Sequence, residues 1–561
     1  MADPGAKRPF GMPSPVLLGS AIAPALAALL ICLRILDLHP HVELSPIEMA
    51  ALLGQLALIY GIPAFVLGGL ADGVLSRLRV EKLGGAVAGL FLIAPLTWFL
   101  WSYTQDTGRF ADPADMRADA SAPLLEVSTA AQEDIVPRQP SPTPVVLLVV
   151  DGADPKLIEQ SVEAGSLPTF ERLMEGGTWG PLLSQQPTLS PILWTTLATG
   201  RPEAAHGVHD FTRFKVPGVA TPLDVLPPGT GLQYWIFPWL ERLPRSPWVR
   251  VPVTSDVRRA ATLWDVAGRH WPVGVYRWLV TWPAEPTSGF LVAGGVWAGA
   301  SEDGGWHPDS RRWREAREEH GDGLDHGWFE PAELAEQLPP PRPAPRGPEL
   351  RPYLRPGDPI DHQDPDLRFI ARSLREPTLR HLGWLVEHHR PTLLAASFYS
   401  VDAFGHRFVD QHRDGGPYER AITARYQMTD RQLGRLIERL DTVYGSYHLL
   451  VVSDHGWDFE AGHHFDAPAG FFLAHGPAFE ADRWVPGASL FDVAPLVLHL
   501  LGLPVAESMP GAHLFETLLA PDALPPPRWI ADYPRPPRET QQAPALDERR
   551  RQELRSLGYL P

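Results

Sequence analysis

Short, wholly aliphatic runs constrain the fold of this 561-residue chain more than any other feature of its sequence. The run Val145–Val150 stops at Asp151-Gly152. A second run ends near Ser400, and a third covers residues 447–453. Apolar runs of this length and composition are typical of strands buried on both faces of a parallel sheet. Helical periodicity follows the first run, and an amphipathic stretch at 422–441 separates the other two. The alternation predicts an α/β fold with a mostly parallel sheet.

An aspartate follows each of these three runs, at Asp151, Asp402 and Asp454. Sites in open α/β sheets lie at the carboxyl ends of the strands, so we expect the three carboxylates to converge there. A single aspartate after a strand is more often a helix cap than a ligand. Three of them at equivalent places favour a binding site.

Histidines accompany the second and third aspartates. His406 follows Asp402 by four residues, which brings the two side chains to one side of a helical turn. His455 comes directly after the third aspartate, and His463 and His464 follow in AGHHFDAP. Carboxylates and imidazoles suit zinc, manganese or iron. Two such ions about 3.5–4 Å apart can hold the attacking and leaving oxygens of a displacement at phosphorus.

The segment QQPTLSPILWTTLATG, residues 185–200, carries five hydroxyl side chains. Ser190 fits two roles: the N-cap of a helix, which is the commonest use of a serine there, or a nucleophile activated by a metal ion. Thr188, Thr195 and Thr196 are interpreted as structural. The acid and histidine motifs favour Ser190 as the nucleophile.

These blocks resemble the type I phosphodiesterase/nucleotide pyrophosphatase family of the alkaline phosphatase superfamily. The resemblance covers most of 145–515 and is carried by VVDGAD, PTLSPILWTTLATGRPEAAHGV, VDAFGH and VVSDHG. It implies an alkaline-phosphatase-like three-layer domain. It also implies two divalent ions, most often zinc and alternatively manganese. One ion would be bound by Asp151, Ser190, Asp454 and His455, and the other by Asp402, His406 and a later histidine, His464 in preference to His463.

The resemblance further implies that Ser190 forms a covalent phosphoseryl intermediate. The family's nucleotide pyrophosphatases typically have an asparagine three residues after the nucleophile, where this chain has Leu193. The expected activity is therefore a phosphodiesterase-like hydrolase of phosphate esters, with the substrate and the residues that bind it left open. The alternatives are a phosphoethanolamine- or phosphoglycerol-type transferase acting on envelope lipids or glycans, and, less favoured, a non-catalytic sensor.

Three uncharged apolar runs, at 16–33, 49–71 and 83–103, open the chain. Each is long enough to cross a bilayer as a helix, which predicts a three-span membrane anchor over 1–103. Lys7 and Arg8 before the first run, and three basic residues between the second and third, predict a cytoplasmic amino terminus. The protein is then expected in the cell inner membrane, with its catalytic domain in the periplasm.

The remaining organisation follows from composition. A stretch rich in Ala, Asp, Pro and Ser predicts a linker over 104–143, and 144–561 is the expected catalytic domain, with an inserted cap region at about 211–390. The net charge of −17 argues against nucleic acid as a partner. A small-molecule, lipid or glycan phosphate ester is expected instead. The single cysteine, Cys32, excludes a disulfide within the chain.

Overall fold

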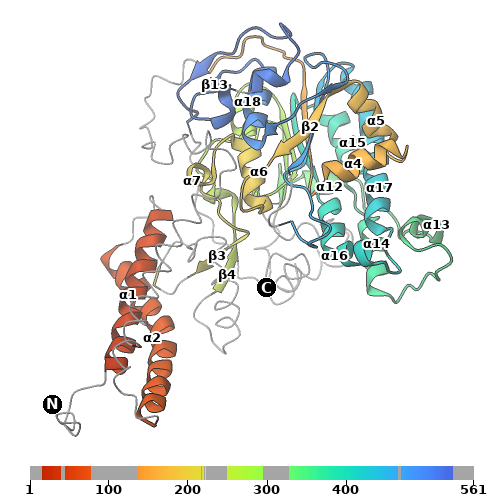
Figure 1. Cartoon of the computed structure of the whole chain (residues 1–561). Coiled ribbons are helices and arrows are strands. Elements are labelled where there is room, and N and C mark those ends of the chain that lie inside the picture. Colours follow the sequence, from red (N-terminus) through yellow and green to blue (C-terminus); the bar gives the residue numbers. More distant parts are fainter. Residues whose placement is uncertain are drawn as a thin grey trace, which may run out of the picture. The chain divides into compact units, whose positions relative to one another are not determined.

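The computed structural model describes residues 15–38, 45–77, 87, 135–215, 218–219, 222, 249–294, 328–464, 469–513 and 515–534 (Figure 1). The chain divides into two units. The first comprises Met1–Arg109 and Thr212–Val251, and the second comprises Phe110–Phe211 and Pro252–Pro561. Each unit is described separately below.

A mixed sheet forms the centre of the second unit. In the part of the chain that the structure describes, its strands are β1 Val145–Val150, β2 Gly177–Leu183, β5 Val273–Trp278, β6 Phe290–Ala293, β7 Phe329–Glu330, β8 Leu393–Phe398, β9 His448–Val452, β10 Gly470–His475, β11 Arg483–Trp484 and β12 Ala488–Ser489. They run in the order β11-β2-β10-β9-β1-β8-β5-β6-β7, and β12 also pairs with β2. The pairs from β9 through β1, β8 and β5 to β6 are parallel, whereas β10 and β7 run antiparallel to their neighbours. The predicted mostly parallel sheet is confirmed.

Alternate residues of β1 face two separate hydrophobic cores. Val145, Leu147 and Val149 lie in one core, and the residues between them lie in the other. On the first side pack α6 Ser190–Thr199, α10 Leu263–Ala267 and α18 Leu490–Leu500. On the second side pack α4 Pro155–Glu163, α5 Pro168–Glu175, α14 Pro365–Ser373, α15 Thr378–His389, α16 Ser400–Asp414 and α17 Ala421–Tyr444. Figure 1 shows these two helical layers on either side of the sheet. Burial on both faces explains why the strand reads as an unbroken aliphatic run.

Shorter elements complete the second unit. They are α7 Glu203–His206, α12 Leu334–Gln337, α13 Gly347–Leu350, the 3-10 turns Ser255–Val257, Arg351–Tyr353, Pro510–His513 and Phe515–Leu518, and the parallel pair β13 Val505–Ala506 and β14 Trp529–Ile530. Part of the predicted linker packs here, because the Arg138 amide donates to the Gly502 carbonyl at 3.0 Å. Within the predicted cap, 211–390, the strands β5, β6 and β7 belong to the main sheet. The domain boundaries otherwise stay predictions, since 104–134, 223–248 and 295–327 lie outside the described residues.

The first unit contains the helices α1 Pro15–Leu38 and α2 Pro46–Arg77, the short strand β3 Thr212–Lys215 and all but the last residue of the short strand β4 Val249–Pro252. Two reciprocal hydrogen bonds cap the start of α2. The Ser45 amide donates to the Glu48 carboxylate at 2.9 Å, and the Glu48 amide donates to Ser45 Oγ at 3.3 Å. The two helices pack on each other. Cys32 is buried in this contact, with its Sγ 3.2 Å from Met49 Sδ.

The prediction of a transmembrane anchor is wrong. Among the residues that the structure describes, no helix has both the length and the apolar character that a bilayer crossing requires. The inner-membrane localisation, with a cytoplasmic amino terminus and a periplasmic catalytic domain, depended on that anchor and is corrected with it. Apolar runs also suit helices that pack on each other, as α1 and α2 do, so run length alone did not separate the two cases. The third run, 83–103, lies outside the described residues except for one position.

Candidate active site

The three aspartates that follow the aliphatic runs lie together at the carboxyl edge of the central strands. Asp151 follows β1, Asp402 lies in the first turn of α16 after β8, and Asp454 follows β9. Because β1 pairs with both β8 and β9, these three strand ends are adjacent. All three carboxylates are buried, with no more than 2% of any residue exposed.

The first cluster that could hold a metal ion consists of Asp151, Asp454 and His455. His455 Nε2 lies 3.7 Å from Asp151 Oδ1 and 3.6 Å from Asp454 Oδ2. His455 Nδ1 lies 3.0 Å from the Gly456 carbonyl, which can only accept, so in the neutral ring Nε2 keeps its lone pair. Within the described part of the chain, neither His455 Nε2 nor Asp454 Oδ2 has a hydrogen-bond partner, although both are buried. Two buried and unsatisfied ligand atoms that face each other fit a divalent cation.

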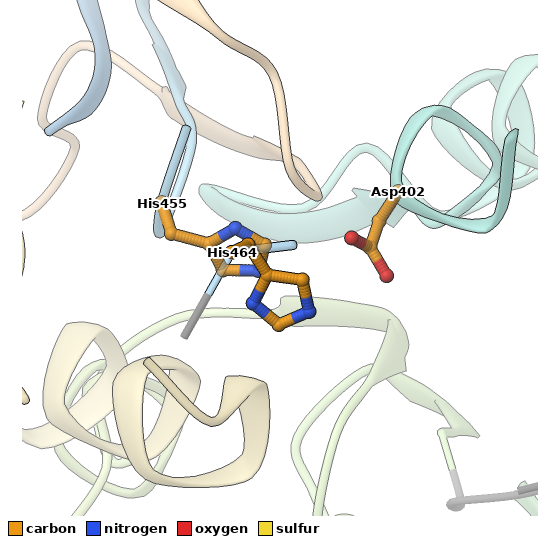
Figure 2. Close-up of side chains that lie close together, drawn as sticks. All are labelled: Asp402, His455 and His464. Atoms are coloured by element: carbon orange, nitrogen blue, oxygen red, sulfur yellow. The ribbon is translucent and has the colours of Figure 1, made fainter. Parts of the chain in front are cut away.

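The second cluster consists of Asp402, His455 and His464, which Figure 2 shows converging from three separate segments. The His455 and His464 rings stack with centroids 4.2 Å apart. His406 joins this cluster, because its Nε2 lies 3.0 Å from His464 Nε2 and 3.3 Å from Asp402 Oδ2. His455 therefore belongs to both clusters. His463 enters neither of them; its backbone forms a bridge with Asp458 instead.

The electrostatics of the site follow from burying several acids and imidazoles together. Burial, reinforced by the neighbouring Asp454 and Asp402, raises the pKa of Asp151 well above its ordinary value. Burial alone would also raise the pKa of Asp402, but the nearby imidazoles, His406 first among them, lower it. Burial, together with the adjacent His455, lowers the pKa of His464 well below its usual range. Carboxylates crowded in this way repel one another, and cations bound between them would offset that repulsion.

Ser190 is the first residue of α6, and its hydroxyl faces the first cluster. The residue is fully buried, and its Oγ donates to Asp151 Oδ1 at 3.4 Å, a long hydrogen bond. The N-cap residue of α6 is Leu189, and no side chain caps the helix. The N-cap interpretation of Ser190 therefore does not fit, and its hydroxyl is turned toward the acids.

The other hydroxyls of α6 bond within the protein interior. Thr195 Oγ1 donates to the Pro191 carbonyl at 2.6 Å, and Thr199 Oγ1 donates to the Thr195 carbonyl at 2.7 Å. Such bonds to the preceding helical turn are a usual way to satisfy a threonine inside a helix. Leu193 is fully buried in the core on the α6 side of the sheet. The position at which the family's pyrophosphatases typically carry asparagine is thus a packing position here.

Sequence reasoning missed the residues that join the loop after β1 to the loop after β9. Asp154 caps α4 through the Leu157 amide at 2.9 Å and also accepts from the Trp457 amide at 3.3 Å. Ser453 Oγ accepts from the Ala153 amide at 2.7 Å and donates to the His455 carbonyl at 2.8 Å. An aspartate directly before a proline that begins a helix is a recognisable N-cap signal, so Asp154 was accessible from the sequence. Its second bond, across the site, was not.

The fold and the acid–histidine clusters define a protein of the alkaline phosphatase superfamily. The family model "Type I phosphodiesterase / nucleotide pyrophosphatase" matches residues 145–476, which is more than half of the chain. The chain belongs to this family, as the sequence resemblance predicted. Membership supports a phosphoester hydrolase or transferase that acts on a phosphate ester, and the superfamily typically depends on divalent metal ions.

Individual curated relatives match shorter segments of the chain. The 2,3-bisphosphoglycerate-independent phosphoglycerate mutase of Haloarcula marismortui is 29% identical over 139 residues, 23% of this chain and 25% of the relative. The enzyme of the same name from Gloeobacter violaceus is 28% identical over 149 residues, 24% of this chain and 26% of the relative. The chain thus spans about a quarter of the length of the curated relatives it matches.

The solved structures that match the chain are more distant in sequence. Murine ectonucleotide pyrophosphatase/phosphodiesterase 5, as an inactive variant in complex with AMP, is 13% identical with a TM-score of 0.40. That match covers 67% of this chain and 100% of the other. A 2-O GAG sulfatase is 12% identical with a TM-score of 0.39, covering 67% of this chain and 74% of the other.

Proposed function

We propose that this protein is a metal-dependent hydrolase of phosphate esters that uses Ser190 as its nucleophile and passes through a phosphoseryl intermediate. The observation that carries the proposal is the position of the Ser190 hydroxyl, buried and hydrogen-bonded to Asp151 beside two clusters of acids and histidines. Family membership supports the reaction class. No other hydroxyl among the described residues of α6 is turned toward these acids.

Two divalent ions, with zinc preferred and manganese as the second choice, fit the donors that are present. Asp151, Asp454 and His455 would hold the first ion near Ser190, and Asp402, His406 and His464 would hold the second. His464 takes precedence over His463 because His464 lies within the second cluster. Bound at these ligands, the ions supply positive charge that stabilises an ionised serine oxygen and the charge that builds on the phosphate oxygens.

The chemistry proceeds in two displacements at phosphorus. Ser190 Oγ attacks, the Oγ–P bond forms and the bond to the ester oxygen breaks, so that this oxygen departs with the bonding electrons as an alkoxide, which takes up a proton from solvent. The serine proton leaves along the hydrogen bond to Asp151 Oδ1. Water then attacks phosphorus on the opposite side, and the Oγ–P bond breaks. Ser190 Oγ recovers its proton from Asp151, and the attacking water releases a proton to solvent. Burial of Ser190 and the three aspartates keeps bulk water away from the first displacement.

The test uses the full-length protein stripped of metal with EDTA and then reloaded with zinc or manganese. Release of p-nitrophenol from bis-p-nitrophenyl phosphate and from p-nitrophenyl phosphate should require metal. Ser190→Ala should abolish it, with a loss of at least about 10³-fold. Ser161→Ala removes a buried serine on α4, outside both clusters, and should keep wild-type rates.

Two results would overturn the proposal. One is turnover that does not depend on metal, and the other is turnover that survives Ser190→Ala. Trapping gives an independent readout of the intermediate: brief acid quenching with a ³²P-labelled ester should leave label on the wild-type chain and none on Ser190→Ala. Label that forms but is discharged only when a second alcohol is added would assign the protein to phosphoryl transfer instead of hydrolysis.

A further inference from the structure

Trp457 occupies a place against the candidate metal ligands that the reaction scheme does not use. It follows the Asp454-His455-Gly456 turn after β9, and only 3% of it is exposed. Its ring meets His406 edge-on, with centroids 4.9 Å apart and planes at 81°. It meets His464 in the same manner, at 5.1 Å and 70°. One indole therefore touches two of the three side chains assigned to the second ion.

Two glycines make room for this indole. A Cβ on Gly405, which lies in α16 directly before His406, would overlap Trp457 Cε2. A Cβ on Gly152, whose φ is +66°, would lie 2.9 Å from Trp457 Nε1 and 2.8 Å from Asp402 Cβ. Both distances are shorter than real Cβ contacts. The ring is thus enclosed between the loop after β1 and the first turns of α16, with the planes of the two imidazoles steeply inclined to its own.

The indole is held by packing and not by a polar contact of its ring. Its Nε1 has no hydrogen-bond partner among the described residues, although it is buried. The backbone amide of Trp457 does bond, to Asp154 Oδ2 at 3.3 Å, which fixes where the residue enters the site. What the ring contributes is shape: a flat, rigid surface that restricts how far the His406 and His464 rings can rotate.

From this geometry we infer that Trp457 is a positioning residue for the second metal ion. It holds His406 and His464 in the orientation in which their Nε2 atoms face each other at 3.0 Å beside Asp402. The inference rests on the proposed function, because it requires that these three residues bind a metal ion. Among the described residues, the Trp457 ring makes no ring contact with a residue of the first cluster other than through the second. Loss of the indole should therefore weaken the binding of the second ion only.

Zinc binding by the full-length protein tests the inference. Zinc content after gel filtration and competition with a chromophoric chelator give the stoichiometry and the affinity of each ion. The wild type should bind two ions. Trp457→Ala should bind one ion with wild-type affinity and the other at least about tenfold more weakly, the range expected when a group that orients a ligand is lost. Trp457→Phe should recover most of the affinity, since phenylalanine keeps a flat ring and gives up no hydrogen bond.

Gly405→Ala supplies a second, independent perturbation, because the added methyl displaces the indole. It should weaken the same ion. If Gly405 acts only through Trp457, the double variant Gly405→Ala with Trp457→Ala should be no worse than Trp457→Ala alone. Trp384→Ala is the matched control: it removes a half-buried tryptophan that stacks on His388 in α15, and it should leave both affinities unchanged.

The outcomes separate the inference from the function on which it rests. A wild-type chain that binds neither zinc nor manganese overturns the proposed function and the inference with it. A wild-type chain that binds two ions, together with Trp457→Ala binding both just as tightly, overturns the inference alone. Thermal unfolding of the metal-free variants checks that they fold: similar midpoints with a selective loss of one ion support the positioning role. Equal weakening of both ions contradicts it.

Discussion

Acidification is expected to destabilise the second unit through His448, the first residue of β9. This strand delivers Asp454 and His455 to the site. Only 3% of His448 is exposed, and its ring meets Phe479 edge-on at 5.9 Å. Within the described residues its Nδ1 has no hydrogen-bond partner, so a charged ring would be unsatisfied. Burial accordingly lowers the pKa of His448 from its ordinary 6.5 to about 4.

The sign of the effect follows from which state binds the proton. Above pH 6.5 the ring is neutral in the folded and unfolded chains. As the pH falls below 6.5 the unfolded chain takes up a proton that the folded protein excludes, so stability is lost progressively until the pH approaches 4. The separation of about 2.5 pH units corresponds to about 3 kcal/mol in full, of which about 2 kcal/mol is already lost at pH 5.

Urea unfolding at pH 7.5 and at pH 5.0, in EDTA so that metal release does not contribute, measures this loss. Between the two pH values the His448→Leu variant should lose about 2 kcal/mol less than the wild type. His362→Gln, at an exposed position, should lose as much as the wild type. Equal losses in the wild type and His448→Leu would refute the argument that burial of this ring couples stability to pH.

Two further substitutions probe side-chain contacts of α4 and α6. Asp154→Ala should lower the free energy of unfolding by about 1–3 kcal/mol, because the first turn of α4 and the Trp457 amide both lose an acceptor. Asp154→Asn, which keeps one acceptor oxygen, should lose less, and an unchanged thermal midpoint for Asp154→Ala would contradict the assignment. Thr196→Val should cost about 1–3 kcal/mol in urea unfolding, because it removes the hydroxyl that lies 3.1 Å from Nε2 of the buried His206. Thr196→Ser keeps the hydroxyl and should restore most of the loss; equal losses in the two variants would indicate packing instead.

Much of the second unit could be read from the sequence because burial on both faces leaves a local signature. The runs that became β1, β8 and β9 lie within one or two residues of their predicted positions. The aspartates came with them, since each lies within four residues of the end of its strand. The amphipathic stretch at 422–441 lies within α17, Ala421–Tyr444. In each case the sequence pattern and the strand or helix that it predicts depend on the same few neighbouring residues.

Features that depend on distant contacts could not be read in this way. The resemblance favoured His464 over His463, but the contacts that separate the two could not be predicted: Gly462 adopts φ +79° and His463 bridges to Asp458. The match between Trp457 and Gly405 joins two segments with no shared local pattern. The prediction of a membrane anchor was wrong for the opposite reason. The local pattern of long apolar runs was strong, but it suits helices packed on each other as well as helices in a bilayer.

The central position of β1 has a consequence for how the protein is made. Val145–Val150 is the first strand of the main sheet to be synthesised, yet both of its partners, β8 and β9, come late in the chain. Until the ribosome has passed Phe398 neither edge of this aliphatic strand can pair, and until it has passed Val452 only the edge toward β8 can. Unpaired apolar edges invite wrong association. The chain must also close two long loops before either pairing can form, which slows folding. Folding of the second unit is therefore a late event that involves nearly the whole chain. The acids and histidines of the candidate site come together only when β8 and β9 have paired with β1.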